Sequence, residues 1–382
     1  MPINEGHMWK EACARNKPLR HCAFTLLAHP SMASPVPSSV LLLLLSCIAF
    51  FSASSQAYEY PPIVSGLSFD FYKSTCPNVE PLVRNYLVQL FKKDIGLAAA
   101  LLRVHFHDCF VQGCDGSILL DGSAGGPSEK NAPPNLTLRP AAFKAINDLR
   151  TLISKACGQV VSCSDISALA ARDSVFLSGG PDYRVPLGRR DGLSFATRDA
   201  VLNFLPSPTS DVTTLINALA KLNLDTTDLV TLSGGHTIGI GHCTSFQNRL
   251  FPSQDSTLEP TFAKNLYLTC PVKDTTNTTV NDIRTPNTFD NKYYVDLVSK
   301  QGLFTSDQGL YGDSRTKPLV TSFAANQPLF FGKFVYSMTK MGQLSVLTGK
   351  QGEIRKNCSA LNSGKKVLWS VVDGEGDGSE VF

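Results

Sequence analysis

The sequence lacks a hydrophobic run long enough to cross a membrane and lacks an excess of either charge. Its apolar stretch 40–51 is shorter than the roughly 20 residues that a bilayer-spanning helix needs. The 35 Lys and Arg residues nearly balance the 32 Asp and Glu residues, which leaves a net charge of +3, and there is no basic tract. We therefore expect neither nucleic acid nor, once a leader is removed, a membrane as a partner.

The sequence also lacks the alternating pattern of long strands and has no internal repeat. Apolar residues recur at helical spacing instead, for example in 79–91 and 215–222. A chain of 382 residues with 43% hydrophobic content can bury one large core or two domains. The Pro-Ser-Pro segment 206–208 interrupts the helical pattern near the middle. We predict a helical chain with two halves, 58–210 and 211–358.

Eleven cysteines are too many for an ordinary cytosolic enzyme and suggest an oxidising compartment. The run 40–51 ends in small residues at 55–57, which is the pattern of a signal-peptide core and cleavage site. Removing the leader 1–57 takes away three cysteines and leaves an even number. We therefore expect a secreted mature chain. A complete signal peptide begins at Met32, the expected translation start, although 32–39 contains no Lys or Arg.

The tail 359–382 is apolar around 367–369 and acidic beyond that point. One interpretation is a propeptide that sorts the protein to the vacuole rather than the cell wall. The other is an error in the gene model. The sequence leaves both open.

Arg103 and His107 lie four residues apart, in a segment that the Ala- and Leu-rich run 98–102 marks as helical. Both side chains therefore share one helix face. A fixed cation beside a histidine suits the heterolysis of a peroxide, because one group moves a proton between the oxygens and the other stabilises the developing charge. Taken alone, such a pair is more often a surface ion pair and a satisfied core histidine.

A zinc site is the sharper alternative for the same segment. His105, His107 and Asp108 resemble a His-x-His-x-Asp ligand set. That set needs a strand or loop, in which residues two apart share a face, whereas on a helix His105 and His107 point apart. The preceding run has few β-branched residues, so we disfavour zinc.

Five longer motifs together resemble the secretory plant haem peroxidases of class III. They are RVHFHDCFVQGCDGSILL at 103–120, SCSDISALAARD at 162–173, PLGRRDG at 186–192, DLVTLSGGHTIG at 228–239 and RTPNTFDNKYY at 284–294. The motifs occur in the family's order, and the resemblance covers about 67–358. It implies an all-α, two-domain fold with one haem b between a distal half that carries His107 and a proximal half that carries His236.

By this resemblance, His236 is the axial ligand of the haem iron and Asp307 accepts a hydrogen bond from its other ring nitrogen. Without the resemblance, a histidine after Gly234 and Gly235 would more often be a turn residue. Phe106 is expected to contact the cofactor.

The resemblance also assigns the distal residues. His107 transfers the peroxide proton, Arg103 stabilises the separating charge, and Asn135 fixes the tautomer of His107. Asn135 begins an Asn-Leu-Thr sequon, so a surface glycan is the alternative. We favour the buried role and take Asn277 as the better glycan site.

Two calcium sites are implied, each an all-oxygen ligand set. The first comprises Asp108, Val111, Gly113, Asp115, Ser117 and Glu129. The second comprises Thr237, Asp282, Thr285, Thr288 and Asp290. Calcium in the first set would hold the end of the helix that carries His107, and Glu129 would reach Asn135. Without the resemblance, the first set could equally be an acidic loop.

The remaining expectations concern disulfides and partners. Sequence alone leaves the disulfide pairing open; the resemblance implies Cys76 with Cys157, Cys109 with Cys114, Cys163 with Cys358, and Cys243 with Cys270. It also implies that the carbonyl of Pro206 faces the donor, although Pro206 could simply form a turn. The expected partners are hydrogen peroxide and small phenols, and the expected state is a monomer.

Two other functional classes stay in view. The first is a cell-wall protein, stabilised by calcium and disulfides, that has lost catalysis; it would need a damaged site, yet the expected catalytic residues are present. The second is an intracellular ascorbate-type peroxidase. Phe106 stands where that class carries Trp, and together with the signal peptide it argues against this class.

Overall fold

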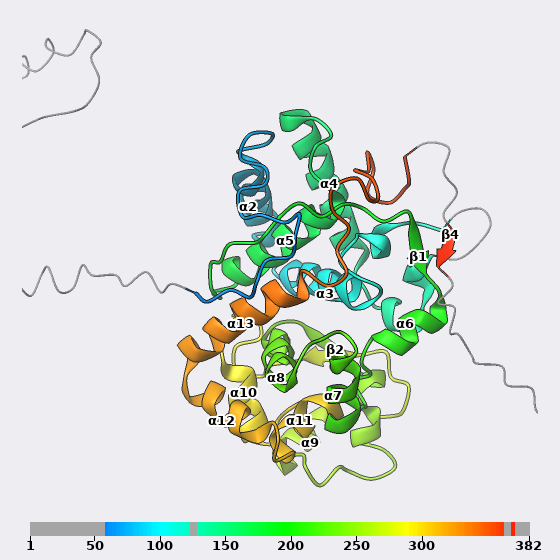
Figure 1. Ribbon diagram of the computed structural model, residues 1–382. Coiled ribbons are helices and arrows are strands. Elements are labelled where there is room, and N and C mark those ends of the chain that lie inside the picture. Colours follow the sequence, from blue (N-terminus) through cyan, green and yellow to red (C-terminus); the bar gives the residue numbers. More distant parts are fainter. Residues whose placement is uncertain (1–57, 123–127, 363–367, 371–382) are drawn as a thin grey trace, which may run out of the picture. The chain divides into compact units, whose positions relative to one another are not determined.

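The structure is a computed structural model that describes residues 58–122, 128–362 and 368–370. The predicted signal peptide and most of the tail lie outside the described residues. Helices dominate the secondary structure (Figure 1). The α-helices are α2 (Val79–Phe91), α3 (Gly96–Phe110), α4 (Pro140–Cys157), α5 (Cys163–Leu177), α6 (Arg198–Phe204), α7 (Val212–Ala220), α8 (Thr226–Ser233), α9 (Pro260–Thr269), α10 (Lys292–Val298), α11 (Thr305–Gly312), α12 (Lys317–Ala325) and α13 (Gln327–Met341).

Short elements connect the helices. The 3-10 helices are η1 (Ser117–Leu119), η2 (Glu129–Asn131), η3 (Pro133–Asn135), η4 (Gly234–Thr237), η5 (Cys243–Ser245) and η6 (Gln247–Arg249). The strands are β1 (Ser194–Ala196), β2 (Ile240–His242), β3 (Thr278–Val280) and β4 (Leu368–Ser370). β1 pairs with β4 in parallel, and β2 pairs with β3 antiparallel. Each strand has only three residues, so the predicted all-α class is confirmed.

The expected helical segments form helices. The spacing in 79–91 corresponds to α2, whose Val83 and Leu87 are completely buried. The spacing in 215–222 corresponds to α7, but this helix ends at Ala220. Leu222 instead lies in the following turn, where its N–H donates to the Leu219 carbonyl at 2.9 Å.

Helices α2 to α5 form the first helical group, and α3 packs against α5 at its centre. α5 is buried on nearly all sides, which small residues such as Ala168, Ala170 and Ala171 permit. The Ser162 hydroxyl accepts a hydrogen bond from the Asp165 N–H and so caps the N-terminus of α5. This packing holds α3 rigidly, and α3 carries Arg103 and His107.

The second helical group, α7 to α13, packs around aromatic side chains. Phe330 lies 5.0 Å from Tyr294, 5.8 Å from Phe323 and 5.6 Å from Phe334, measured between ring centroids. These distances are typical of favourable aromatic pairs. In Figure 1, α13 lies on the side of this group that faces the first group, and it contacts both α8 and α3. The domain boundary at 210 stays a prediction.

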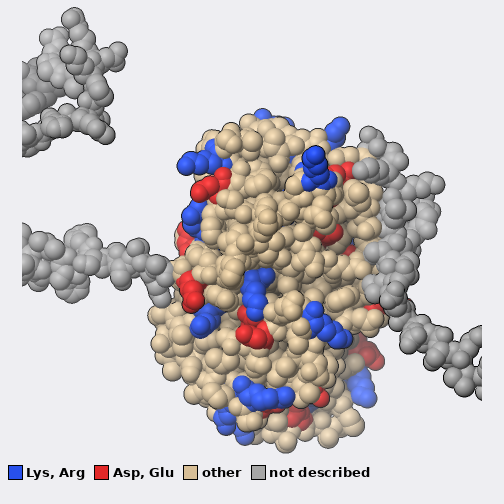
Figure 2. All heavy atoms as spheres, viewed as in Figure 1, with Lys and Arg blue, Asp and Glu red and all other residues tan. Residues whose placement is uncertain are grey.

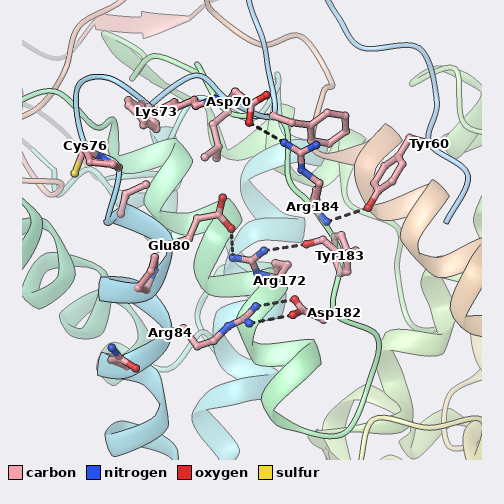
Figure 3. A pocket seen from close by; sticks show the side chains of 17 residues that line it. Tyr60, Asp70, Lys73, Cys76, Glu80, Arg84, Arg172, Asp182, Tyr183 and Arg184 are labelled. Carbon is pink, nitrogen blue, oxygen red and sulfur yellow. Dashed lines mark hydrogen bonds and ion pairs between the residues drawn. The ribbon is translucent and has the colours of Figure 1, made fainter. Parts of the chain in front are cut away.

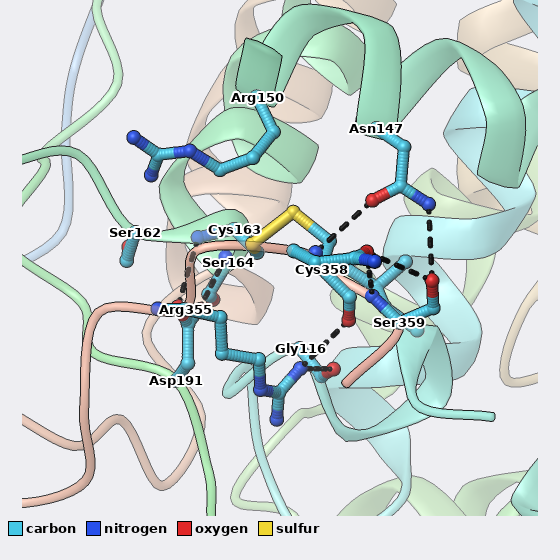
Figure 4. The surroundings of a disulfide bond; sticks show 12 residues. Gly116, Asn147, Arg150, Ser162, Cys163, Ser164, Asp191, Arg355, Cys358 and Ser359 are labelled. Atoms are coloured by element: carbon cyan, nitrogen blue, oxygen red, sulfur yellow. Dashed lines mark hydrogen bonds between the residues drawn. A yellow bond between two sulfur atoms is a disulfide. The ribbon is translucent and has the colours of Figure 1, made fainter. Parts of the chain in front are cut away.

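All four disulfides implied by the resemblance are present: Cys76–Cys157, Cys109–Cys114, Cys163–Cys358 and Cys243–Cys270. Cys163–Cys358 spans 195 residues and attaches the C-terminal segment to the start of α5 (Figure 4). Arg355 continues this attachment, because its guanidinium donates to the Gly116 carbonyl at 2.6 Å. The C-terminal segment thereby supports the loop that follows α3.

The surface mixes both charges. On the face shown in Figure 2, basic and acidic side chains are interspersed. This is the distribution of a solvated surface. Among the described residues, no helix combines the length and the apolar character that crossing a bilayer requires.

Candidate active site

Helix α3 brings Arg103 and His107 together as their spacing predicts. The Arg103 Nε–H donates to Nε2 of His107 at 3.1 Å. His107 is buried, with 4% of its surface exposed. Because Nε2 accepts this hydrogen bond, it carries a lone pair and no proton.

The other ring nitrogen of His107 contacts Asn135. Nδ1 lies 2.6 Å from Asn135 Oδ1, and since Nε2 is the acceptor nitrogen, Nδ1 carries the proton and donates. The Asn135 amide in turn donates to the Glu129 carbonyl at 2.9 Å. Glu129 thus reaches Asn135 through its backbone rather than its carboxylate. Burial, reinforced by the charge of Arg103, lowers the pKa of His107 to about 3, which keeps the ring neutral at neutral pH and leaves the Nε2 lone pair free to accept a proton.

The Arg103 guanidinium is held by a segment outside the five family motifs. It donates to the Pro134 carbonyl at 3.0 Å, to the Thr137 hydroxyl at 2.9 Å and to the Thr137 carbonyl at 3.2 Å. Both polar residues of the Asn-Leu-Thr sequon therefore serve the Arg/His pair. Asn135 is only 3% exposed, which leaves no room for a glycan.

His105 lies on the opposite face of α3, so the zinc interpretation is wrong. Its ring is 3.7 Å from Cys109 Sγ and close to Gly342, whereas His107 faces Arg103 and Asn135. The two histidines cannot bind one ion. Burial, reinforced by the charge of Arg189, lowers the pKa of His105 to about 3.

We predict that His105→Gln reduces the pH dependence of folding. The folded pKa of His105 lies below its ordinary value of 6.5, so between these values the unfolded chain binds a proton that the folded chain does not. Stability therefore falls as pH drops from about 6.5 towards 3, with a slope of up to about 1.4 kcal/mol per pH unit for one group. Urea unfolding of both proteins at several pH values measures the difference, and identical slopes would contradict the prediction.

On the proximal side, η4 follows α8 directly and presents His236. Its Nδ1–H donates to Asp307 Oδ1 at 2.8 Å, although 71 residues separate the two in sequence. The His236 side chain is 43% exposed, whereas that of Asp307 is 3% exposed. Since Nδ1 is engaged, Nε2 is the ring nitrogen available to a metal.

The Asp307 carboxylate has two further donors. Its Oδ2 accepts from the Phe304 N–H at 3.1 Å, and its Oδ1 accepts from the Tyr293 hydroxyl at 2.9 Å. Sequence reasoning missed Tyr293. Its only signal is its position in the family motif 284–294, and that motif by itself assigns no role to the hydroxyl.

The glycines before His236 have different roles. A Cβ on Gly234 would lie 2.4 Å from the Tyr294 hydroxyl, so this glycine is required by the aromatic core. A Cβ on Gly235 would lie 3.7 Å from Leu102 on α3, and one on Gly239 would lie 3.0 Å from Ala99. The segment with His236 therefore lies beside α3. The partly exposed His236 therefore lies near the helix that carries the half-buried Arg103 and the buried His107, and this arrangement fits a haem.

The first predicted calcium set contains buried oxygens without hydrogen-bond partners. Among the described residues, such atoms include Asp108 Oδ1, Ser117 Oγ and Glu129 Oε1. Burial raises the pKa values of Asp108 and Glu129 well above their ordinary range, and it raises the pKa of Asp115 to about 6. Desolvated, unpartnered carboxyl oxygens of this kind fit a bound cation.

The geometry of this set also shows what a cation would need. No three His, Cys, Asp or Glu side chains in the described part of the chain converge closely enough to form a metal site by themselves. Hydroxyl and backbone oxygens, such as those predicted for Ser117, Val111 and Gly113, would have to contribute. In this structure the Gly113 carbonyl accepts from the Asp115 N–H at 2.9 Å.

The second predicted set is compact. The Thr237 hydroxyl lies 3.1 Å from Asp282 Oδ2 and 3.4 Å from Asp290 Oδ1. The Thr285 hydroxyl lies 3.5 and 3.1 Å from the same two oxygens. Thr288 is exposed, and its N–H donates to the Thr285 carbonyl at 2.9 Å. Thr237, Asp282, Thr285 and Asp290 thus gather around the residue that directly follows His236.

An open pocket of about 760 Å³ lies away from these residues (Figure 3). It is lined mainly by the segment before α2, by α2 itself and by the segment after α5. Its arginines are neutralised: Arg84 pairs with Asp182, Arg172 with Glu80, and Arg184 with Asp70. None of the predicted catalytic or cofactor residues lines it. Pro206 is half-buried in the segment after α6.

Residues 83–326 match the family described as Peroxidase. The chain is 60% identical to cationic peroxidase SPC4 of Sorghum bicolor over 84% of this chain and 89% of that protein. It is 63% identical to peroxidase 12 of Arabidopsis thaliana, over 79% and 84% respectively. It is 42% identical to peroxidase C1B of Armoracia rusticana, over 90% and 98%. The chain therefore belongs to the class III plant haem peroxidase family and is a peroxidase enzyme.

Proposed function

We propose that the enzyme reduces hydrogen peroxide with Arg103, His107 and Asn135, and that His236, oriented by Asp307, would hold the iron of a haem. The observation that carries this proposal is the chain of hydrogen bonds from Arg103 through His107 to Asn135. It leaves His107 neutral, with its lone pair on Nε2. When bound, haem supplies the electrons that cleavage of the peroxide requires.

The distal residues would act in a defined order. A peroxide entering the site must replace the Arg103 Nε–H at Nε2 of His107. His107 then accepts the proton of one peroxide oxygen at Nε2 and returns it to the other oxygen. Asn135 keeps accepting from Nδ1–H, which holds the tautomer, and the guanidinium of Arg103 stabilises the departing oxygen.

We further propose that the donors are small phenols, each oxidised by one electron, and that the Pro206 carbonyl faces them. The support is the family membership and the half-buried position of Pro206, two residues after the end of α6. An absorption spectrum combined with peroxide assays on guaiacol and ascorbate tests this proposal. Oxidation of guaiacol far in excess of ascorbate supports it. A haem-loaded enzyme that prefers ascorbate would contradict the phenolic assignment.

We also propose a secreted monomer whose mature chain begins near Tyr58. The four disulfides support an oxidising compartment. Mass spectrometry of the protein purified from its source and sedimentation analysis test the mature start and the monomer. An intact leader or a stable dimer would contradict the proposal.

Calcium is proposed for both oxygen sets, and the first set gives a testable prediction. Exhaustive chelation should lower both the melting temperature and the rate of reaction with peroxide, because calcium binds only the folded chain. Asp115→Ala should remove about one calcium per chain and should also lower the rate of reaction with peroxide. Elemental analysis, calorimetry and stopped-flow spectroscopy measure these quantities.

Asp121→Ala is the matched control. Asp121 is an acidic residue of the same region, but its side chain is 67% exposed and pairs with Lys130. We expect this variant to retain its calcium and its melting temperature within a degree or so, as for most surface substitutions. An enzyme without calcium, or equal calcium loss in both variants, would overturn the assignment.

A further inference from the structure

Tyr293 and His236 donate to the same oxygen of Asp307. The two distances to Oδ1 are 2.9 Å from the tyrosine hydroxyl and 2.8 Å from His236 Nδ1. The remaining oxygen, Oδ2, accepts from the Phe304 N–H at 3.1 Å. Tyr293 and Asp307 are each only 2% exposed, so this arrangement is shielded from water.

The position of Tyr293 is well determined by its surroundings. It lies near the start of α10, and its ring packs edge-on against Tyr294 with 5.0 Å between centroids. Its ring is also roughly perpendicular to that of His236, at 6.1 Å and 83°. The hydroxyl is therefore directed at Asp307 by packing and has little freedom to move away.

Two donors on one carboxylate oxygen compete for its charge. A histidine that donates to a carboxylate becomes a stronger electron donor to its metal. A second hydrogen bond to the same oxygen removes part of that charge and weakens this effect, especially in a site of low dielectric. The tyrosine hydroxyl must therefore oppose the influence of Asp307 on His236.

We propose that Tyr293 is a positioning residue that limits how strongly Asp307 polarises His236, and that it thereby raises the reduction potential of the haem iron. The inference rests on the proposed role of His236 as iron ligand. It assigns the hydroxyl a function beyond packing. Axial ligation and its hydrogen bonds are established means by which proteins tune such potentials.

Tyr293→Phe tests the proposal, with Tyr294→Phe as the matched control. Tyr294 is the adjacent tyrosine and is fully buried, but its hydroxyl donates to the Val230 carbonyl at 2.9 Å instead of to Asp307. We expect Tyr293→Phe to raise the iron–histidine stretching frequency of the ferrous enzyme and to lower its midpoint potential. Tyr294→Phe should change neither quantity, even if it reduces stability.

Tyr293→Phe should also affect the reaction with peroxide and the oxidation of the donor differently. Tyr293→Phe should react with peroxide at close to the wild-type rate, because Arg103 and His107 are unchanged. Its one-electron oxidation of a donor should slow, because the potential that drives this step is lower. Equal losses in both reactions would indicate general damage and would overturn the proposal.

A second variant reverses the sign of the effect. Site-specific 3-fluorotyrosine at position 293 has a more acidic hydroxyl, which donates more strongly, so the stretching frequency should fall and the potential should rise. An unchanged iron–histidine stretching frequency in both Tyr293→Phe and the 3-fluorotyrosine variant would contradict the inference. His236→Ala distinguishes the ligand assignment from the tyrosine inference. If iron ligation remains intact in His236→Ala, the assignment of His236 as ligand fails. If His236→Ala abolishes ligation while Tyr293→Phe changes neither the frequency nor the potential, only the tyrosine inference fails.

Discussion

His107→Ala should retain haem and lower the rate of reaction with hydrogen peroxide by about 10²- to 10⁴-fold, the usual contribution of one general acid–base group. The reason is that His107 Nε2 is the unprotonated nitrogen of the Arg103–His107 pair, so no other base is held in this place. Arg103 cannot replace it. Its pKa is lowered by burial only to about 10, and it stays charged at neutral pH.

Stopped-flow spectroscopy of the haem-loaded variant measures this rate. His105→Gln is the control, because His105 is buried on the same helix but faces away from Arg103. It should react with peroxide at nearly the wild-type rate. If His107→Ala also reacted at that rate, the assignment of the proton-transfer residue would be wrong.

His236→Ala should lose most of its haem, because it removes the proposed bond between the protein and the iron. Added imidazole should partly restore both haem binding and peroxidase activity, since a free imidazole can occupy the space of the missing ring beside Asp307. The pyridine haemochrome assay gives the haem content per chain. Titration with imidazole then tests the rescue.

His242→Ala provides the comparison in the same part of the chain. His242 lies in β2, six residues after His236, and is half-buried. This variant should keep a full complement of haem. A His236→Ala protein with full haem and an unchanged spectrum would require another ligand.

The local part of the site followed from the sequence. Spacing by four residues places Arg103 and His107 on one face of any helix, and the run 98–102 identified that helix without tertiary information. The same geometry separated His105 from His107 and correctly disfavoured zinc. Local rules suffice here because the distances within a helix are set by its backbone.

Contacts between distant segments could be named from the resemblance, but local rules could not predict them. The pairing of His236 with Asp307 and the disulfide Cys163–Cys358 join residues 71 and 195 positions apart. No periodicity specifies such partners, because they depend on how whole helices pack. The resemblance to the family supplied them only as correspondences.

The tertiary structure alone decided three details. Thr137 and Pro134 bind the guanidinium of Arg103, Glu129 reaches Asn135 by its carbonyl, and Tyr293 shares the carboxylate oxygen of Asp307. Each depends on which atom of a side chain or backbone faces its neighbour. That orientation is set by the packing of neighbours from all sides. The order of residues along the chain determines the geometry within each helix, but it does not determine which atoms of different segments face one another.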